Sequence, residues 1–67
     1  MRLVNLIKAR KIRGLTQTDV GKLIGKSQSH YAKIERGEID FSAREALSLC
    51  DFFNISLKKL LSSKEMN

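Results

Sequence analysis

Residues 14–38 read GLTQTDVGKLIGKSQSHYAKIERGE, and this stretch decides the fold. It contains two short segments, 17–24 and 28–36, that are separated by Gly25 and followed by Gly37. Glycine interrupts and ends helices because it is costly within them and adopts the left-handed backbone that terminates them. The stretch therefore predicts two short helices that are joined by a tight turn.

The residues that start these two helices support the same prediction. Thr16 with Asp19 three residues later is a variant of the capping box, in which each residue bonds the backbone N–H of the other. Ser27 is a good N-cap for the second helix. In the first helix the residues expected to be buried are Val20, Leu23 and Ile24.

The segment before this stretch predicts another helix, over 3–13. Leu3, Leu6, Ile7 and Arg10 are spaced as i, i+3, i+4 and i+7, so they share one face of a helix. Gly14 is placed to end it with a left-handed conformation.

The segment after the stretch predicts two further helices. Ser42 and Glu45 form an S-x-x-E capping box, and the helix that follows ends near Asn54 with an apolar stripe of Ala46, Leu49, Cys50 and Phe53. Ser56 caps a short helix that reaches residue 61, in which the residues expected to face inward are Leu57, Leu60 and Leu61. Residues 62–67 are polar and are expected to be a frayed tail. The prediction is an all-α, five-helix fold.

The length of 67 residues predicts a single domain over 1–67 with a marginal core. The single cysteine, Cys50, cannot form an internal disulfide, which suits a reducing, cytoplasmic environment. No segment has the pattern of a signal peptide or the roughly 20 apolar residues of a membrane span. We therefore expect a cytoplasmic protein without a membrane partner, although the chain is also compatible with one domain of a larger protein.

Positive charge is concentrated in the first half of the chain. Residues 1–36 contain nine Lys or Arg and two acidic residues, whereas the remaining 31 residues are nearly neutral, within a total net charge of +6. A basic half beside a neutral half is typical of proteins that bind a polyanion, although solvated lysines give the same charge.

The predicted helix over 28–36 has two unlike sides. Tyr31, Ile34 and Glu35 share one side, and the other side carries small, polar and cationic residues, namely Ser29, Ala32, Lys33 and Arg36, with Gln28 at the exposed start. These side chains suit base edges in the major groove, where glutamine pairs with adenine and lysine with guanine. The outer side of any surface helix is similar, but the preceding turn and the charge asymmetry favour DNA binding.

The motifs GLTQ (14–17) and KIERGE (33–38), with the small residue Gly21 between them, resemble the Xre family of lambda-repressor-like, Cro-type domains. The resemblance extends from Leu3 to Leu61. It implies a compact five-helix domain with a helix-turn-helix at about 17–36 that binds operator DNA as a dimer, usually as a repressor. It also implies that Gly21 is small because the two helices cross closely there.

The resemblance implies roles for individual residues. Base contacts are expected from Gln28, Ser29, Ala32 and Lys33. Contacts to DNA phosphates are expected from Gln17, Lys26, Ser27, Arg36 and Arg44. Tyr31 stands where the family has a branched aliphatic residue, which suggests a core ring with a hydroxyl that reaches the DNA backbone.

Arg10 and Glu35 are expected to form a semi-buried salt bridge. Each lies on the apolar face of its predicted helix, and a charge on such a face is costly unless it is paired. The resemblance implies the same pairing.

The apolar residues near the C-terminus exceed what so small a core needs. Phe52, Ile55 and Leu57 are therefore the expected dimer interface, and a two-fold dimer suits a pseudo-palindromic site.

The sequence contains no pattern for an enzyme, a cofactor, a metal site or a small-molecule ligand. One histidine and one cysteine are too few for a structural zinc site. The expected partner is double-stranded DNA. Alternatives within the same fold are a restriction–modification controller and an antitoxin, and an alternative outside DNA binding is a protein-interaction module.

Overall fold

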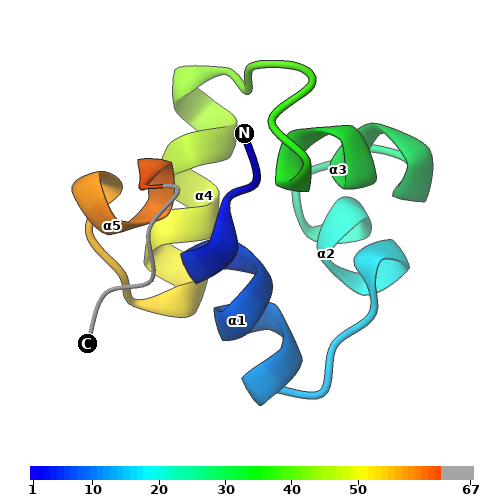
Figure 1. Cartoon of the computed structure of the whole chain (residues 1–67). Coiled ribbons are helices and arrows are strands. Elements are labelled where there is room, and N and C mark those ends of the chain that lie inside the picture. Colours follow the sequence, from blue (N-terminus) through cyan, green and yellow to red (C-terminus); the bar gives the residue numbers. More distant parts are fainter. Residues whose placement is uncertain (63–67) are drawn as a thin grey trace.

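The computed structural model describes residues 1–62, which form five helices and no strand (Figure 1). The helices are α1 (Val4–Ile12), α2 (Gln17–Leu23), α3 (Gln28–Glu35), α4 (Ala43–Phe53) and α5 (Leu57–Leu61). The all-α, five-helix prediction is confirmed. Of the tail expected to be frayed, Ser62 caps α5 through its N–H to the carbonyl of Lys59, and 63–67 lie outside the described residues.

Four of the five helices begin at the hydroxyl residue that the sequence predicts. Thr16, Ser27, Ser42 and Ser56 each accept a hydrogen bond from the backbone N–H three residues later. Full capping boxes form at α2 and α4, where the Asp19 and Glu45 carboxylates also accept the N–H of the capping residue. These bonds satisfy donors that a helix start otherwise leaves unpaired.

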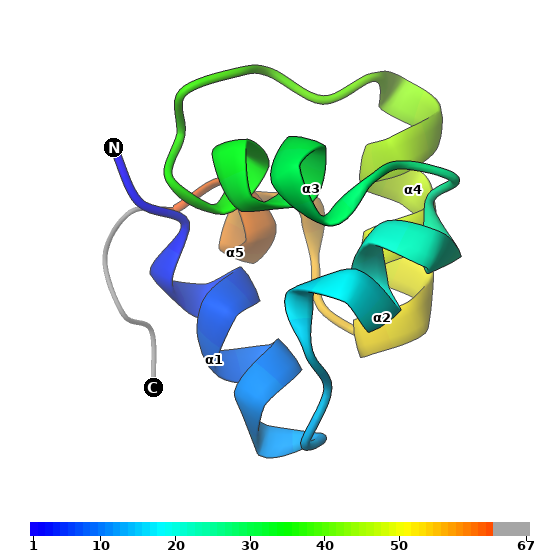
Figure 2. The ribbon, with the colours of Figure 1, turned by 90° about the vertical axis from the view of Figure 1, so that its right-hand side faces the viewer.

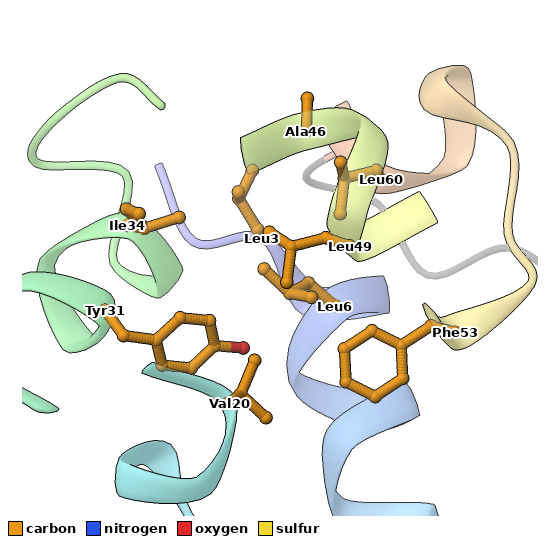
Figure 3. Packing of buried hydrophobic residues seen from close by; sticks show 9 residues of the cluster. All are labelled: Leu3, Leu6, Val20, Tyr31, Ile34, Ala46, Leu49, Phe53 and Leu60. Carbon is orange, nitrogen blue, oxygen red and sulfur yellow. The ribbon is translucent and has the colours of Figure 1, made fainter. Parts of the chain in front are cut away.

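A single apolar core lies where the five helices meet. Its buried residues come from every helix or its cap, as Figure 3 shows: Leu3, Leu6, Val20, Tyr31, Ile34, Ala46, Leu49, Phe53 and Leu60. Burying a large apolar side chain contributes about 1.5–3 kcal/mol. α2 and α3 lie together at one face of this core; in the view of Figure 2, α3 lies in front of α5 and α2 in front of α4.

Three leucines that are expected to face inward are about half exposed instead, and one of them, Leu57, is also expected at a dimer interface. Leu23 is 43% exposed, Leu57 51% and Leu61 49%. α2 and α5 are too short to bury a broad face, and successive residues turn by 100°. In α2 the buried residues are Val20 and Gly21, so Leu23 points away from the core. In α5 the buried residue is Leu60.

Candidate nucleic-acid interface

The turn between α2 and α3 is held directly against α2. Gly25 has a φ of 71°, and the N–H of Lys26 donates to the carbonyl of Gly21 at 2.8 Å. A Cβ on Gly21 would lie 2.9 Å from the Lys26 carbonyl oxygen and 3.1 Å from that of Ser27. Gly21 is therefore small because α2 lies close to the turn and to the start of α3, of which Ser27 is the N-cap.

The exposed side of α3 carries most of the residues that the sequence assigns to it. Ser29, Lys33 and Arg36 are exposed, and Gln28 is exposed at the start of the helix. Ala32 is only 4% exposed, so it lies on the inward side of α3 and not on the exposed side to which the sequence assigns it, which removes the reason for expecting it to contact a base. The inward side of α3 is wider than expected, since Tyr31, Ala32, Ile34 and Glu35 are all buried.

The Tyr31 hydroxyl also differs from its expected place. The side chain is completely buried, and its hydroxyl points into the core near Val20 (Figure 3). The hydroxyl oxygen is buried without a hydrogen-bond partner among the described residues, so it does not reach the surface. Burial, together with the neighbouring Glu35 carboxylate, raises the pKa of Tyr31 well above its ordinary value. The residue is part of the core.

Arg10 and Glu35 pair across α1 and α3, as the sequence predicts. Arg10 Nε donates to Glu35 Oε2 at 2.6 Å and Nη2 donates to Oε1 at 3.3 Å. Arg10 Nη1 also donates to the carbonyl of Leu15 at 2.9 Å. Glu35 is 3% exposed, and its carboxylate raises the pKa of the Arg10 guanidinium. The pair compensates two charges that would otherwise be costly to bury.

A line of hydrogen bonds extends this pair to the surface. Gln17 Nε2 donates to Glu35 Oε1 at 2.9 Å, and Gln28 Nε2 donates to Gln17 Oε1 at 2.7 Å. Sequence reasoning missed this line. The available signal was that Gln17 and Gln28 are the first residues of consecutive helices, whose starts a tight turn brings together. The result is that the Gln28 amide is held in one orientation.

Two of the cations expected to bind phosphate have carboxylate partners within the chain. Lys26 Nζ lies 3.8 Å from Glu45 Oε2, with its side chain 43% exposed. Arg36 forms an ion pair with Glu38 that lowers the pKa of that carboxyl. Arg44 is exposed near the start of α4. All three cations remain at the surface, so they are accessible to an anion.

The Ser27 hydroxyl is occupied locally. It accepts the backbone N–H of His30 at 3.1 Å as the N-cap of α3. Ser27 is exposed, and a serine hydroxyl that accepts one bond still has its own proton to donate. Its predicted contact with a phosphate therefore has a donor.

The three residues expected at a dimer interface are not equally exposed. Phe52 is 36% exposed, with its ring 4.9 Å from that of Phe53 and 4.9 Å from the Arg13 guanidinium. Ile55 is partly buried against the core, and Leu57 is 51% exposed. Phe52 and Leu57 therefore offer most of the free apolar surface in this set.

Two short helices around a tight turn, with the second exposed along a polar and cationic side, define a helix-turn-helix unit that binds DNA. The helix-turn-helix family matches residues 6–60. The chain therefore belongs to the helix-turn-helix family, of the Xre, lambda-repressor-like type, and is a DNA-binding regulator. The comparisons matched no curated protein and no solved structure.

Residues 1–62 contain neither a candidate membrane span nor a candidate metal-binding group of side chains. None of the helices there has the length and apolar character needed to cross a membrane. No three His, Cys, Asp or Glu side chains in the same range are grouped so that they could hold a metal ion.

Proposed function

We propose that the protein is a homodimeric transcriptional repressor that binds a pseudo-palindromic operator, with α3 of each subunit in the major groove. One observation carries the proposal. The amide of Gln28 is exposed at the start of α3 and is held through Gln17 by the buried Arg10–Glu35 pair. A polar group that is exposed but fixed in orientation costs little entropy when it binds a base edge.

The proposed base contacts are Gln28, Ser29 and Lys33. Glutamine is able to form two hydrogen bonds with adenine N6 and N7, and lysine donates to guanine O6 or N7. Ser29 is small and exposed, so it lets the helix backbone approach the groove closely.

The proposed phosphate contacts surround α3. They comprise Gln17, Lys26, Ser27, Arg36 and Arg44. Gln17 is the first residue of α2, where free N–H groups and the helix dipole favour an anion. Its side chain is already bonded to Gln28 and Glu35, so its backbone N–H is the better donor to a phosphate.

The proposed dimer interface contains Phe52, Ile55 and Leu57. A two-fold dimer through this region would place two α3 helices one helical turn of DNA apart, about 34 Å. The exposure of Phe52 and Leu57 supports this arrangement. The same geometry serves a restriction–modification controller or an antitoxin, which would differ in the gene regulated and not in the contacts.

Selection of bound sequences from a pool of random duplexes tests the proposal. We expect an inverted repeat whose half-sites are centred about 10 base pairs apart. A parallel selection with the double variant Gln28→Ala and Lys33→Ala should recover duplexes without this repeat. The helix content of the double variant should be unchanged. Failure of the unmodified chain to retain any duplex at low salt would favour a protein-interaction module instead.

A further inference from the structure

The first three residues lie across the C-terminal end of α3 (Figures 1 and 2). The N–H of Leu3 donates to the carbonyl of Glu35 at 2.8 Å, and the amino group of Met1 donates to the carbonyl of Arg36 at 3.4 Å. Leu3 is 6% exposed within the core. These contacts satisfy carbonyls that the end of a helix leaves free, and they hold the segment in place.

Gly37 provides the space for this crossing. A Cβ on Gly37 would lie 1.7 Å from the carbonyl oxygen of Met1 and 2.7 Å from its carbonyl carbon. The φ of Gly37 is also 73°, a conformation that favours glycine. Residue 37 thus ends α3 and also lets the backbone before α1 pass against it.

Arg2, in the segment that makes this crossing, lines a surface hollow together with Gln17, the first residue of α2. The hollow lies between the first residues, α1, α2 and α3, and its volume is about 470 Å³. The residues that line it are Arg2, Ile7, Gln17, Glu35, Arg36 and Glu38. Gln17 and Arg36, both proposed phosphate contacts, therefore share this hollow with Arg2.

The charges in the hollow leave Arg2 uncompensated. Glu35 is paired with Arg10 and bonded to Gln17, and Glu38 is paired with Arg36. Arg2 is exposed and has no carboxylate partner among residues 1–62. An unpaired guanidinium on a fixed backbone is well suited to a phosphate, which it recognises through two parallel hydrogen bonds.

We propose that Arg2 binds a backbone phosphate of the DNA, next to the phosphate at the start of α2. This inference rests on the proposed function and adds to it a contact from the segment before α1. Because that segment is held to the end of α3, the Arg2 contact also helps to set the position of α3 along the groove.

The test compares Arg2→Gln with Lys11→Gln in the full chain. Lys11 is exposed on α1 and lies outside the hollow, so its variant removes one positive charge without removing the proposed contact. The probes are the duplex recovered by selection and a random-sequence duplex. Arg2→Gln should weaken binding to both duplexes by about 2- to 5-fold, as expected for an exposed ion pair. The urea midpoint of each variant checks that both remain folded.

The salt dependence of binding gives a second measurement. Loss of one phosphate contact lowers the slope of log affinity against log salt by about 0.9. Arg2→Gln should show this change, Arg2→Lys should restore most of it, and Lys11→Gln should show less. Equal behaviour of Arg2→Gln and Lys11→Gln would overturn the inference, as would a change in base preference for Arg2→Gln. If the unmodified chain binds no duplex, the proposed function itself fails.

Discussion

Arg10 and Glu35 form a buried ion pair between α1 and α3, with 2.6 Å from Arg10 Nε to Glu35 Oε2. Glu35 also accepts a hydrogen bond from Gln17, which in turn accepts one from Gln28 at the surface. The pair that joins two helices of the core thus also orients the side chain proposed to contact a base.

Removal of either partner of the pair should be strongly destabilising. Glu35→Gln or Arg10→Met leaves one buried charge without compensation, which costs about 3–5 kcal/mol. The double variant Arg10→Met with Glu35→Leu should lose less than either single variant, because it buries no charge. The free energy of unfolding in urea measures all three. If both single variants lower the free energy of unfolding by less than about 1 kcal/mol, the pair behaves as a surface ion pair that solvent screens.

Gln28→Ala should reduce discrimination between bases and not general affinity for DNA. The loss should be about 1–3 kcal/mol at one base pair of the selected site. Arg44→Ala is the matched comparison, since it should weaken binding to all sequences alike and lower the salt slope by about one. Titration of both variants against the selected duplex and its single-base changes separates the two effects. An equal loss on specific and random DNA for Gln28→Ala would contradict its role.

Glu38→Gln should strengthen binding to DNA of any sequence. Glu38 pairs with Arg36 and would repel a phosphate brought to the same place. The neutral variant releases Arg36 and removes the repulsion, so the slope of log affinity against log salt should become steeper by about one. Asp51→Asn removes an exposed negative charge on α4 and serves as a control for net charge. Weaker binding by Glu38→Gln would mean that the ion pair positions Arg36 productively.

The capping box at α2 should make the stability of the fold depend on pH in the acidic range. Hydrogen bonds from Thr16 lower the pKa of the Asp19 carboxyl below its ordinary value of 3.8. A lowered pKa in the folded state adds stability above the unfolded value and loses it as the pH falls through the folded one. Asp19→Asn should therefore lower the thermal midpoint at neutral pH, and the difference from the unmodified protein should shrink as the pH falls below 3.8 and through the lowered pKa of the folded state. A constant difference across this range would contradict the assignment.

Gly21→Ala should destabilise the fold through the turn. Its methyl group would meet the carbonyl oxygen of Lys26 at 2.9 Å, and backbone atoms are unable to rotate away as a side chain does. Overpacking of this kind costs about 1–3 kcal/mol. Lys22 is an exposed residue of the same helix, so the control variant Lys22→Ala should change stability little. The urea midpoints of the two variants make the comparison, and a Gly21→Ala protein as stable as the parent would show that the turn is free to shift.

Sequence reasoning failed where the width of a buried helix face mattered. Spacing predicts that Ala32 lies on the exposed side of its helix and Leu23 in the core, whereas the structure buries Ala32 and leaves Leu23 43% exposed. A spacing pattern gives the centre of an apolar face, but how far burial extends around the helix depends on the neighbouring elements. α3 is covered on more than one side, so Ala32 is buried, whereas α2 turns Gly21 toward the turn and exposes Leu23.

The number, order and ends of the helices were determined by the sequence itself. Thr16, Ser42 and Asn54 act on backbone groups within four residues of themselves, so their effect is visible in the local pattern. The tertiary structure alone decided that Gln17 joins Gln28 to Glu35 and that Arg2 lines the same surface hollow as Gln17. Those relationships join residues 11 or more positions apart, and they arise only when the core brings separate segments to the same place.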